Sequence, residues 1–359
     1  MSKTFDESGA DHAVRKDVEA ALSAGILTEV QASRFLALVA DRNAAAGDEP
    51  FTVFRGMNEI FIIAGLMILS FGWTVGVSAL ATGSGFQDEE VIPWACTAAL
   101  LPLLFLSEYF IRRRRMVGPA IALALLFAIN ALIGIWPLVE GDAPSIFGSY
   151  ENLPATLLLA GGALCLWWLR YRVPFAMAPI ALAIVTAALV FAADRAETPT
   201  GFRDIFLFSA TGPFAWITLA AGLGALAVAL AFDVSDPHRV TRRAAHGFWL
   251  HIVAAPAIVN TVALSLLDAG HPAALFPVLA LFAAFAVIID RRSFLLASCL
   301  HVVALANAVT EGEGAWAAIL GLGVVLLALG SFWTQARCRL VGILPAWLPR
   351  HVLPPVHPG

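Results

Sequence analysis

The stretch Ile111-Arg112-Arg113-Arg114-Arg115-Met116 joins two apolar runs, residues 91–111 and 116–139. Each run is about 20 residues long, which is the length that crosses a hydrocarbon core of roughly 30 Å. Four arginines at such a junction resist translocation, so the turn is predicted to lie in the cytoplasm. Once this turn is placed, every other loop is assigned to a side of the membrane by counting crossings.

The composition of the chain is that of a membrane protein. Of its 359 residues, 60% are hydrophobic and 13% are charged, and the mean hydropathy is +0.82. A soluble domain has about 45–50% apolar and about 25% charged residues. The first apolar run starts near residue 57, behind a long polar segment, which is not the arrangement of a cleavable signal peptide.

Ten apolar runs have the length of a membrane span. They cover residues 57–81, 91–111, 116–139, 152–170, 173–193, 205–232, 244–267, 272–289, 293–310 and 314–334. The segments that this division assigns to the cytoplasm hold 20 of the 22 lysines and arginines, and the outer loops hold only Arg195 and Arg203. This bias predicts an all-α bundle of about ten transmembrane helices over residues 57–334, with both termini in the cytoplasm.

The segments outside the bundle are predicted to be cytosolic. Residues 1–12 are expected to be a disordered tail, and residues 335–359 a Pro-rich tail. Residues 13–45 are predicted to form an amphipathic helical hairpin, in which Gly25 ends the first helix. Thr28 and Gln31 have the spacing of a capping box at the start of the second helix. The hairpin either rests on the membrane or on the protein's own loops, or it docks a cytosolic protein partner at residues 13–42.

Polar side chains within the apolar runs are the candidate functional residues, because such groups are costly in a bilayer. The candidates for a polar interior are Asn130, Asn260, Asn307, His246, His251 and His301. One interpretation makes them interhelical hydrogen-bonding groups that hold the bundle together. The other interpretation makes them the lining of a proton-responsive or substrate-binding path.

Two acidic residues lie at predicted inner ends of spans. Glu59 follows Arg55 by four residues, and Glu108 precedes Arg112 by four. This spacing allows an ion pair on one face of a helix. The pairs either anchor the helices at the interface, or Glu59 and Glu108 form a cytoplasmic vestibule that binds a cation or a proton.

The sequence lacks the patterns that carry enzyme chemistry. It contains no HExxH, GxSxG or phosphate-binding loop, so no catalytic residue is predicted. Cys96, Cys165, Cys299 and Cys338 are too far apart for a metal site, and no cofactor is expected. The positions of the basic residues are explained by the predicted cytoplasmic segments, so no nucleic-acid partner is expected.

The pattern Gly25-Ile26-Leu27-Thr28-Glu29-Val30-Gln31-Ala32, followed by a polar linker and apolar spans, carries a resemblance. It resembles the bacterial predicted membrane proteins that are grouped as domain of unknown function 2157. The resemblance covers roughly residues 13–80. It implies a protein of the bacterial inner membrane without an assigned activity, and it transfers no functional residue.

Three classes of function fit these patterns. The first is a transporter-like bundle for a small molecule or an ion, because polar positions recur at one depth and prolines interrupt spans. The second is a non-catalytic membrane scaffold or regulator that acts through the N-terminal hairpin. The third is a membrane enzyme that uses His246, His251 and His301. The lipid bilayer is the one partner that all three classes share.

Overall fold

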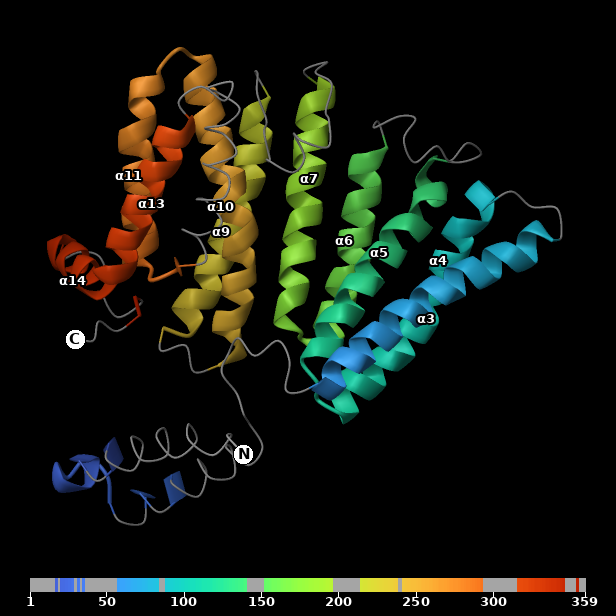
Figure 1. The fold of residues 1–359 in the computed structure, drawn as a ribbon, viewed down its shortest axis with the longest axis horizontal. Helices are drawn as coiled ribbons and strands as arrows, with labels where there is room; N and C mark the ends of the chain where they lie inside the picture. Colours follow the sequence, from blue (N-terminus) through green and yellow to red (C-terminus); the bar gives the residue numbers. More distant parts are fainter. Residues whose placement is uncertain are drawn as a thin grey trace. The chain divides into compact units, whose positions relative to one another are not determined.

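The computed structural model describes residues 17–18, 20–28, 31–32, 34–35, 57–83, 88–140, 152–195, 214–237, 241–292, 315–345 and 353–354. Within these residues every regular element is a helix (Figure 1). The chain divides into two units, Met1–Phe61 and Ile62–Gly359. Each unit is described by itself below.

The first unit contains the turn of the N-terminal hairpin. Gly25 has a φ of +69°, the left-handed conformation with which glycine commonly ends a helix. The backbone N–H of Gln31 donates to Thr28 Oγ1 at 3.3 Å, and the backbone N–H of Thr28 donates to Gln31 Oε1 at 2.9 Å. This reciprocal pair is the capping box that the sequence predicts, and it starts the second helical segment.

Seven helices within the described residues are long and apolar enough to cross a membrane. They are α3 (Met57–Thr82), α4 (Asp88–Ser107) with its π-helical extension η1 (Glu108–Arg113), α5 (Gly118–Glu140), α6 (Leu153–Tyr171), α7 (Met177–Arg195) with the 3-10 turn η2 (Pro174–Ala176) before it, α9 (Ala215–Ser235) and α10 (Arg242–Asp268). Each matches one of the first seven predicted spans, although α9 begins ten residues later than the run at 205–232.

The remaining described helices account for up to one more span. α11 (Pro272–Ile288) is apolar but shorter. α13 (Ala315–Ser331) and α14 (Trp333–Ile343) meet at a bend of 81° and count as an eighth span if the bent pair is one broken crossing. The described residues therefore hold seven or eight of the ten predicted spans. The run at 293–310 lies outside the described residues.

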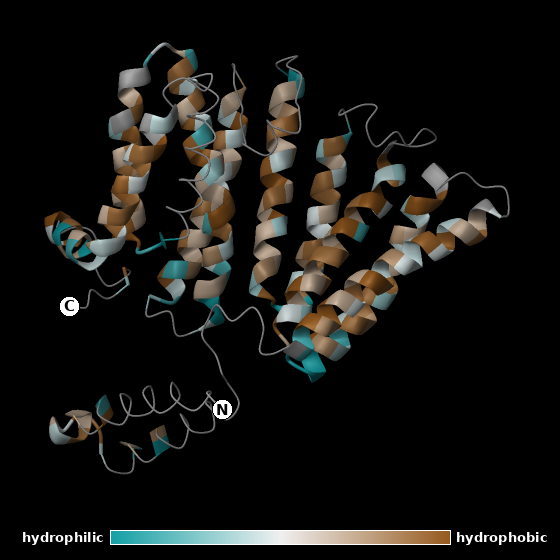
Figure 2. Cartoon of the chain, viewed as in Figure 1, coloured by the Kyte–Doolittle hydropathy of each residue, from teal (hydrophilic) through white to brown (hydrophobic). Residues whose placement is uncertain are grey.

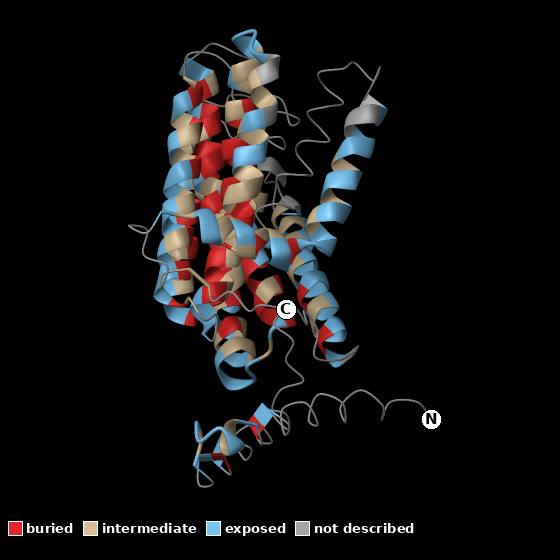
Figure 3. Cartoon of the chain, turned by 90° about the vertical axis from the view of Figure 1, so that its left-hand side faces the viewer, coloured by how far each residue is buried: buried red, intermediate tan, exposed pale blue. Residues whose placement is uncertain are grey.

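The outer surface of the second unit is unusually apolar. Helices carry hydrophobic residues along their whole length (Figure 2), and exposed positions run along the outer sides of the same helices (Figure 3). Phe105 and Leu101, for example, are 82% and 74% exposed. Contiguous exposed apolar surface of this kind marks contact with a membrane or a partner. The pattern fits a helical bundle that is surrounded by lipid.

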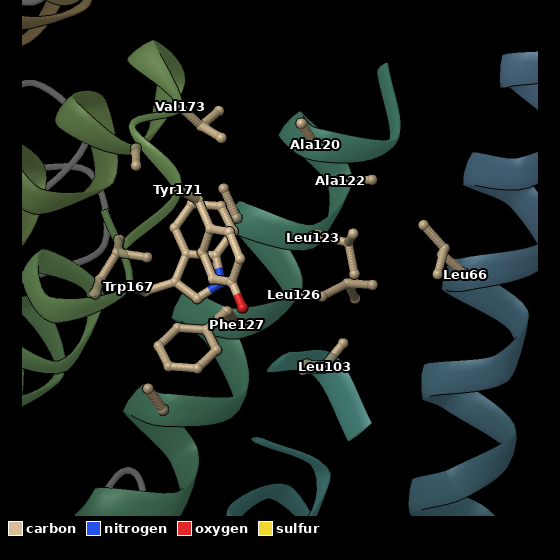
Figure 4. Close-up of a cluster of buried hydrophobic side chains, with 14 of the residues drawn as sticks. Leu66, Leu103, Ala120, Ala122, Leu123, Leu126, Phe127, Trp167, Tyr171 and Val173 are labelled. Atoms are coloured by element: carbon tan, nitrogen blue, oxygen red, sulfur yellow. The ribbon is translucent and has the colours of Figure 1, made fainter. Parts of the chain in front are cut away.

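Residues of α4, α5 and α6 enclose an aromatic core (Figure 4). The ring of Trp167 lies 6.1 Å from that of Phe127 and 4.9 Å from that of Tyr171, centroid to centroid. Trp167 Nε1 donates to Ser107 Oγ at 3.2 Å, and the Tyr171 hydroxyl donates to the carbonyl of Leu104 at 3.0 Å. The polar ends of both buried rings are thus satisfied by α4.

Three of the turns that the sequence places in the cytoplasm have the same backbone feature. Arg115, Arg172 and Asp290 have φ values of 53°, 54° and 55°. Positive φ is uncommon for residues other than glycine. Each of these residues follows the end of a helix. At Arg115 and Arg172 the chain continues directly into the next described helix, so these two helical hairpins have similar turns.

α10 is the most enclosed of the spans. It packs against α9, α7 and α11, and small residues let the backbones approach closely. Ala254, Ala255 and Ala257 are fully buried on α10. On α9, a Cβ added to Gly222 would lie 3.1 Å from Ile258 Cγ1 and 3.2 Å from the Cβ of Ala257. This tight α9–α10 pair brings side chains from the two helices within hydrogen-bonding distance.

The segment after residue 332 contains a helix that the sequence analysis does not specify. The sequence predicts a Pro-rich tail over residues 335–359, and the structure adds that the helix α14 begins at Trp333 and packs on α11. Trp333 Nε1 donates to Asp290 Oδ1 at 2.7 Å. The arginines at 337 and 339 interrupt the apolar pattern by which a helix is recognised in the sequence. Packing against a neighbouring helix can stabilise such a short helix.

Candidate functional site: a buried ionic cluster

Three ionisable side chains from three helical segments meet inside the second unit. Asp233 lies in the last turn of α9, His251 lies in the first half of α10, and Arg291 follows the end of α11. Asp233 is hydrogen-bonded to both His251 and Arg291. These three residues are called the ionic cluster below.

The geometry of the ionic cluster is that of a strong, two-point ion pair with a histidine beside it. Arg291 Nε donates to Asp233 Oδ2 at 2.9 Å, and Arg291 Nη2 donates to Asp233 Oδ1. His251 Nε2 lies 2.8 Å from Asp233 Oδ2. Because an ionised carboxylate only accepts, Nε2 of His251 carries the proton in this arrangement. Two-point arginine–carboxylate pairs fix orientation as well as charge.

The ionic cluster is enclosed by the protein. The side chains of Arg291 and Asp233 are 7% and 10% exposed, and that of His251 is fully buried. Arg291 Nη2 also donates to the carbonyl of Ala244 at 3.0 Å. A Cβ added to Gly247 would lie 2.5 Å from Asp233 Oδ1. A side chain at position 247 would crowd the carboxylate, so glycine there allows Asp233 to approach α10 closely.

The turn between α9 and α10 is fixed by a second aspartate. Asp236 Oδ2 accepts from the backbone N–H of Thr241 at 2.8 Å and from its hydroxyl at 2.7 Å. Thr241 Oγ1 in turn accepts from the backbone N–H of Arg243 at 3.2 Å and caps α10. This loop holds Asp233 and the start of α10 in register.

The residue types of the ionic cluster are those that can exchange protons and bind ions. Desolvation of a buried pair is expensive, so an apolar replacement of the whole pair is often as stable as the pair itself. Buried charge is therefore a weak explanation of stability and a better indicator of function inside a membrane. Histidine is the side chain whose charge changes most readily between pH 5 and 8.

His246 lies one turn before the ionic cluster on α10 and is buried. Its Nδ1 lies 2.7 Å from the carbonyl of Arg242. The imidazole stacks on Phe232 at 5.3 Å between centroids and meets the edge of Trp168 at 5.6 Å. Its Nε2 makes no hydrogen bond to a described residue. His246 thus packs between aromatic rings and does not join Asp233.

The candidate asparagines occupy separate places. Asn130 and Asn260 are both buried, which is the placement that keeps an amide away from lipid. Asn130 Nδ2 donates to the carbonyl of Leu126 at 2.8 Å, within its own helix α5. Helices α6 and α7 lie between α5 and α10 (Figure 1), so the structure does not bring the two amides into one site. His301 and Asn307 lie outside the described residues.

The two candidate vestibule residues differ in environment. Glu108 accepts from Arg112 at 2.5 Å and from Arg170 at 3.1 Å, and its side chain is 44% exposed. The predicted i,i+4 pair with Arg112 is present and has a second guanidinium beside it. Glu59 is buried and belongs to the first unit, whereas Glu108 belongs to the second.

The ionic cluster contains two residues that the sequence did not single out. The predicted run at 205–232 stops just before Asp233, which places this residue in a loop, and Arg291 enters the sequence analysis only as a charge that indicates topology. One signal was available. Gly247 lies between two histidines on a helix that is otherwise apolar, and a glycine there favours close approach of a neighbouring group.

Comparison with known proteins identifies no similar protein. No protein-family model, no curated protein and no solved structure matches the chain. Among the residues that the structure describes, no group of three histidine, cysteine, aspartate or glutamate side chains could hold a metal ion.

Proposed function

We propose that this chain is a multi-pass protein of the bacterial cytoplasmic membrane that carries a small molecule or an ion. In this proposal ten helices cross the bilayer, and both termini and the N-terminal hairpin lie in the cytoplasm. The seven to eight apolar helices and the concentration of arginine in alternate loops support the topology. The resemblance to domain of unknown function 2157 supports the bacterial setting.

The ionic cluster is the observation that carries the proposal. Asp233, His251 and Arg291 lie on three different helical segments, so any movement between α9, α10 and α11 changes their contacts. Ionisable residues within transmembrane segments mark ion pathways and proton relays. A bundle that served only to anchor the hairpin could be held together by apolar packing and neutral hydrogen bonds, without a buried charged pair.

Each residue of the cluster has a distinct role in this proposal. Asp233 holds His251 through Oδ2, and His251 exchanges the coupling proton. Arg291 neutralises Asp233 when the site is closed, and becomes a binding group for an anionic solute when the pair opens. Asn260 lies about 14 Å further along α10 and contributes polar contacts deeper in the bundle.

The proposal is tested with purified protein in liposomes that contain a pH-sensitive dye. Separate samples receive inorganic anions, inorganic cations, amino acids and carboxylic acids. At least one solute is expected to change the internal pH with wild-type protein. His251→Gln should abolish this response, whereas His271→Gln, which alters an exposed histidine in the same way, should retain it. Equal responses of the two variants would contradict the role of His251.

A scaffold role is the second candidate, and the N-terminal hairpin favours it. Ile26 is 74% exposed and Phe35 is 45% exposed. Apolar side chains on a capped helical hairpin fit a protein partner. A photo-crosslinking amino acid at position 35 should then give one discrete adduct in cells, and the same probe at the exposed Ser23 should give none. A solute response without any adduct at position 35 would favour the carrier.

A further inference from the structure

The helix α14 leaves the apolar helix α13 almost at a right angle. The bend between them is 81°, and it occurs at Phe332 (Figure 1). α13 contains no charged residue, whereas α14 carries Arg337 and Arg339. If α13 crosses the bilayer, such a bend directs α14 along the membrane surface. Helices with apolar and basic side chains lie in this plane.

One face of α14 is fixed to the rest of the unit. Trp333 is buried, and its Nε1 donates to Asp290 Oδ1 at 2.7 Å. Arg337 is also buried, and its Nη2 donates to the carbonyl of Pro354 at 2.5 Å. The guanidinium of Arg292 lies 5.3 Å from the centre of the Trp333 ring. Trp333 thus connects α14 to the turn after α11.

A second face of α14 remains exposed and combines charge with apolar surface. Arg339 and Ile343 are four residues apart and therefore share a face. Ile343 is 79% exposed, Arg339 is exposed, and Phe332 at the start of the helix is 60% exposed. Apolar side chains enter the acyl boundary of a bilayer, while a neighbouring guanidinium stays at the level of the phosphates. Arg292 adds a further exposed guanidinium beside Trp333.

The contact of Trp333 with Asp290 leads directly to the ionic cluster. Asp290 precedes Arg291 and has a left-handed backbone, with a φ of 55°. This conformation restricts the turn, so a displacement of Asp290 also displaces Arg291. Arg291 is bonded to Asp233. A short covalent and hydrogen-bonded path therefore runs from α14 to the ionic cluster.

We propose that α14 binds an anionic lipid surface through Phe332, Arg339 and Ile343, and that the Trp333–Asp290 hydrogen bond transmits its position to Arg291. The inference needs the bundle to lie in a membrane, but it does not depend on transport. Anionic headgroups complement the two exposed arginines, and zwitterionic headgroups do not. The lipid composition would thereby alter the contact between Arg291 and Asp233.

Hydrogen–deuterium exchange of the full-length protein in lipid nanodiscs tests both parts. One nanodisc contains only phosphatidylcholine, and the other contains about 30% phosphatidylglycerol, a fraction that gives a clear negative surface. The peptide that covers Trp333–Ile343 is expected to exchange about fivefold more slowly in the anionic nanodisc. The peptide that covers residues 286–292 should be slowed as well. Equal exchange of α14 in the two nanodiscs would overturn the lipid contact.

Matched variants separate the lipid contact from its transmission. Arg339→Gln should abolish the lipid dependence, and Arg113→Gln, which removes an exposed arginine elsewhere, should retain it. Trp333→Phe keeps the ring without the donor, and it should preserve the response of α14 while removing that of residues 286–292. Asp290→Gly removes the acceptor, and glycine tolerates the positive φ at this position. This variant should also preserve the response of α14 and remove that of residues 286–292. A response of residues 286–292 that persists in both variants would overturn the transmission.

Discussion

Asp233 and Arg291 join two helices, α9 and α11, that are separated along the chain by α10. Glu108 and Arg170 form a similar pair, since Glu108 directly follows α4, Arg170 lies in the last turn of α6, and α5 lies between them in the chain. In each case an acidic residue at the end of one helix pairs with an arginine at the end of a second helix, and one further helix lies between the two in the chain. The two pairs differ in exposure, which is 44–52% for Glu108 and Arg170 but 7–10% for Asp233 and Arg291.

This difference predicts unequal effects of the same substitution. Arg291→Met leaves Asp233 buried without its guanidinium and should lower the free energy of unfolding by about 3–5 kcal/mol. Arg170→Met removes an exposed partner of Glu108 and should cost about 1 kcal/mol or less. Equilibrium unfolding in mixed detergent micelles measures both. Similar losses for the two variants would show that Asp233 is not enclosed.

Gly247 should be essential for the approach of Asp233 to α10. In Gly247→Ala the new methyl group would lie 2.5 Å from Asp233 Oδ1, and the overpacking should cost about 1–3 kcal/mol. Gly224→Ala is the matched control, because a Cβ there meets no atom within 4 Å. That change should be neutral or stabilise the helix by up to about 1 kcal/mol. A neutral Gly247→Ala in the same unfolding measurement would contradict the geometry.

The capping box of the N-terminal hairpin should contribute to its local stability. Thr28→Ala removes the acceptor of the Gln31 N–H and should cost about 1 kcal/mol. Faster hydrogen exchange of residues 20–35 in the full-length chain would report the loss. Ser23→Ala, which alters an exposed hydroxyl in the preceding helix, should change this exchange little. If both variants exchange alike, the second helical segment does not depend on the cap.

The four arginines at 112–115 should fix the local topology. Replacing all four with asparagine removes the charge that resists translocation, and mixed orientations of α4 and α5 are expected. Cysteine-accessibility labelling from each side of the membrane measures the orientation. Replacing Arg195 and Arg203 with asparagine is the control and should leave it unchanged. A uniform wild-type pattern after the fourfold change would show that other turns dominate.

The sequence predicted the spans well because hydrophobic length and arginine bias are local signals. The turn at Arg112 to Arg115 and the first seven spans follow from them. The capping box at Thr28 and Gln31 is also local, since both partners lie within one helical turn. The number of spans beyond the seven or eight described remains a prediction.

The candidate site was predicted less completely because it depends on contacts between distant segments. His251 was selected from its place in a span, but its partner Asp233 is 18 residues away, on another helix. Arg291 and Asp233 are 58 residues apart, and no local pattern specifies that distance. Asp233 resembled a loop residue because it ends an apolar run. The sequence does not predict α14, since its buried face includes Arg337 and is covered by α11, which is distant in sequence.

The double variant Asp233→Asn with Arg291→Gln tests most directly whether the ionic cluster takes part in transport or only stabilises the fold. This change removes both charges and keeps polar groups of similar size, so the unfolding free energy should stay within about 2 kcal/mol of the wild type. The measurement is the solute-driven change of internal pH in liposomes that contain this variant. We predict that the response is lost while the fold is retained. A response at the wild-type rate would contradict a role of the ionic cluster in transport.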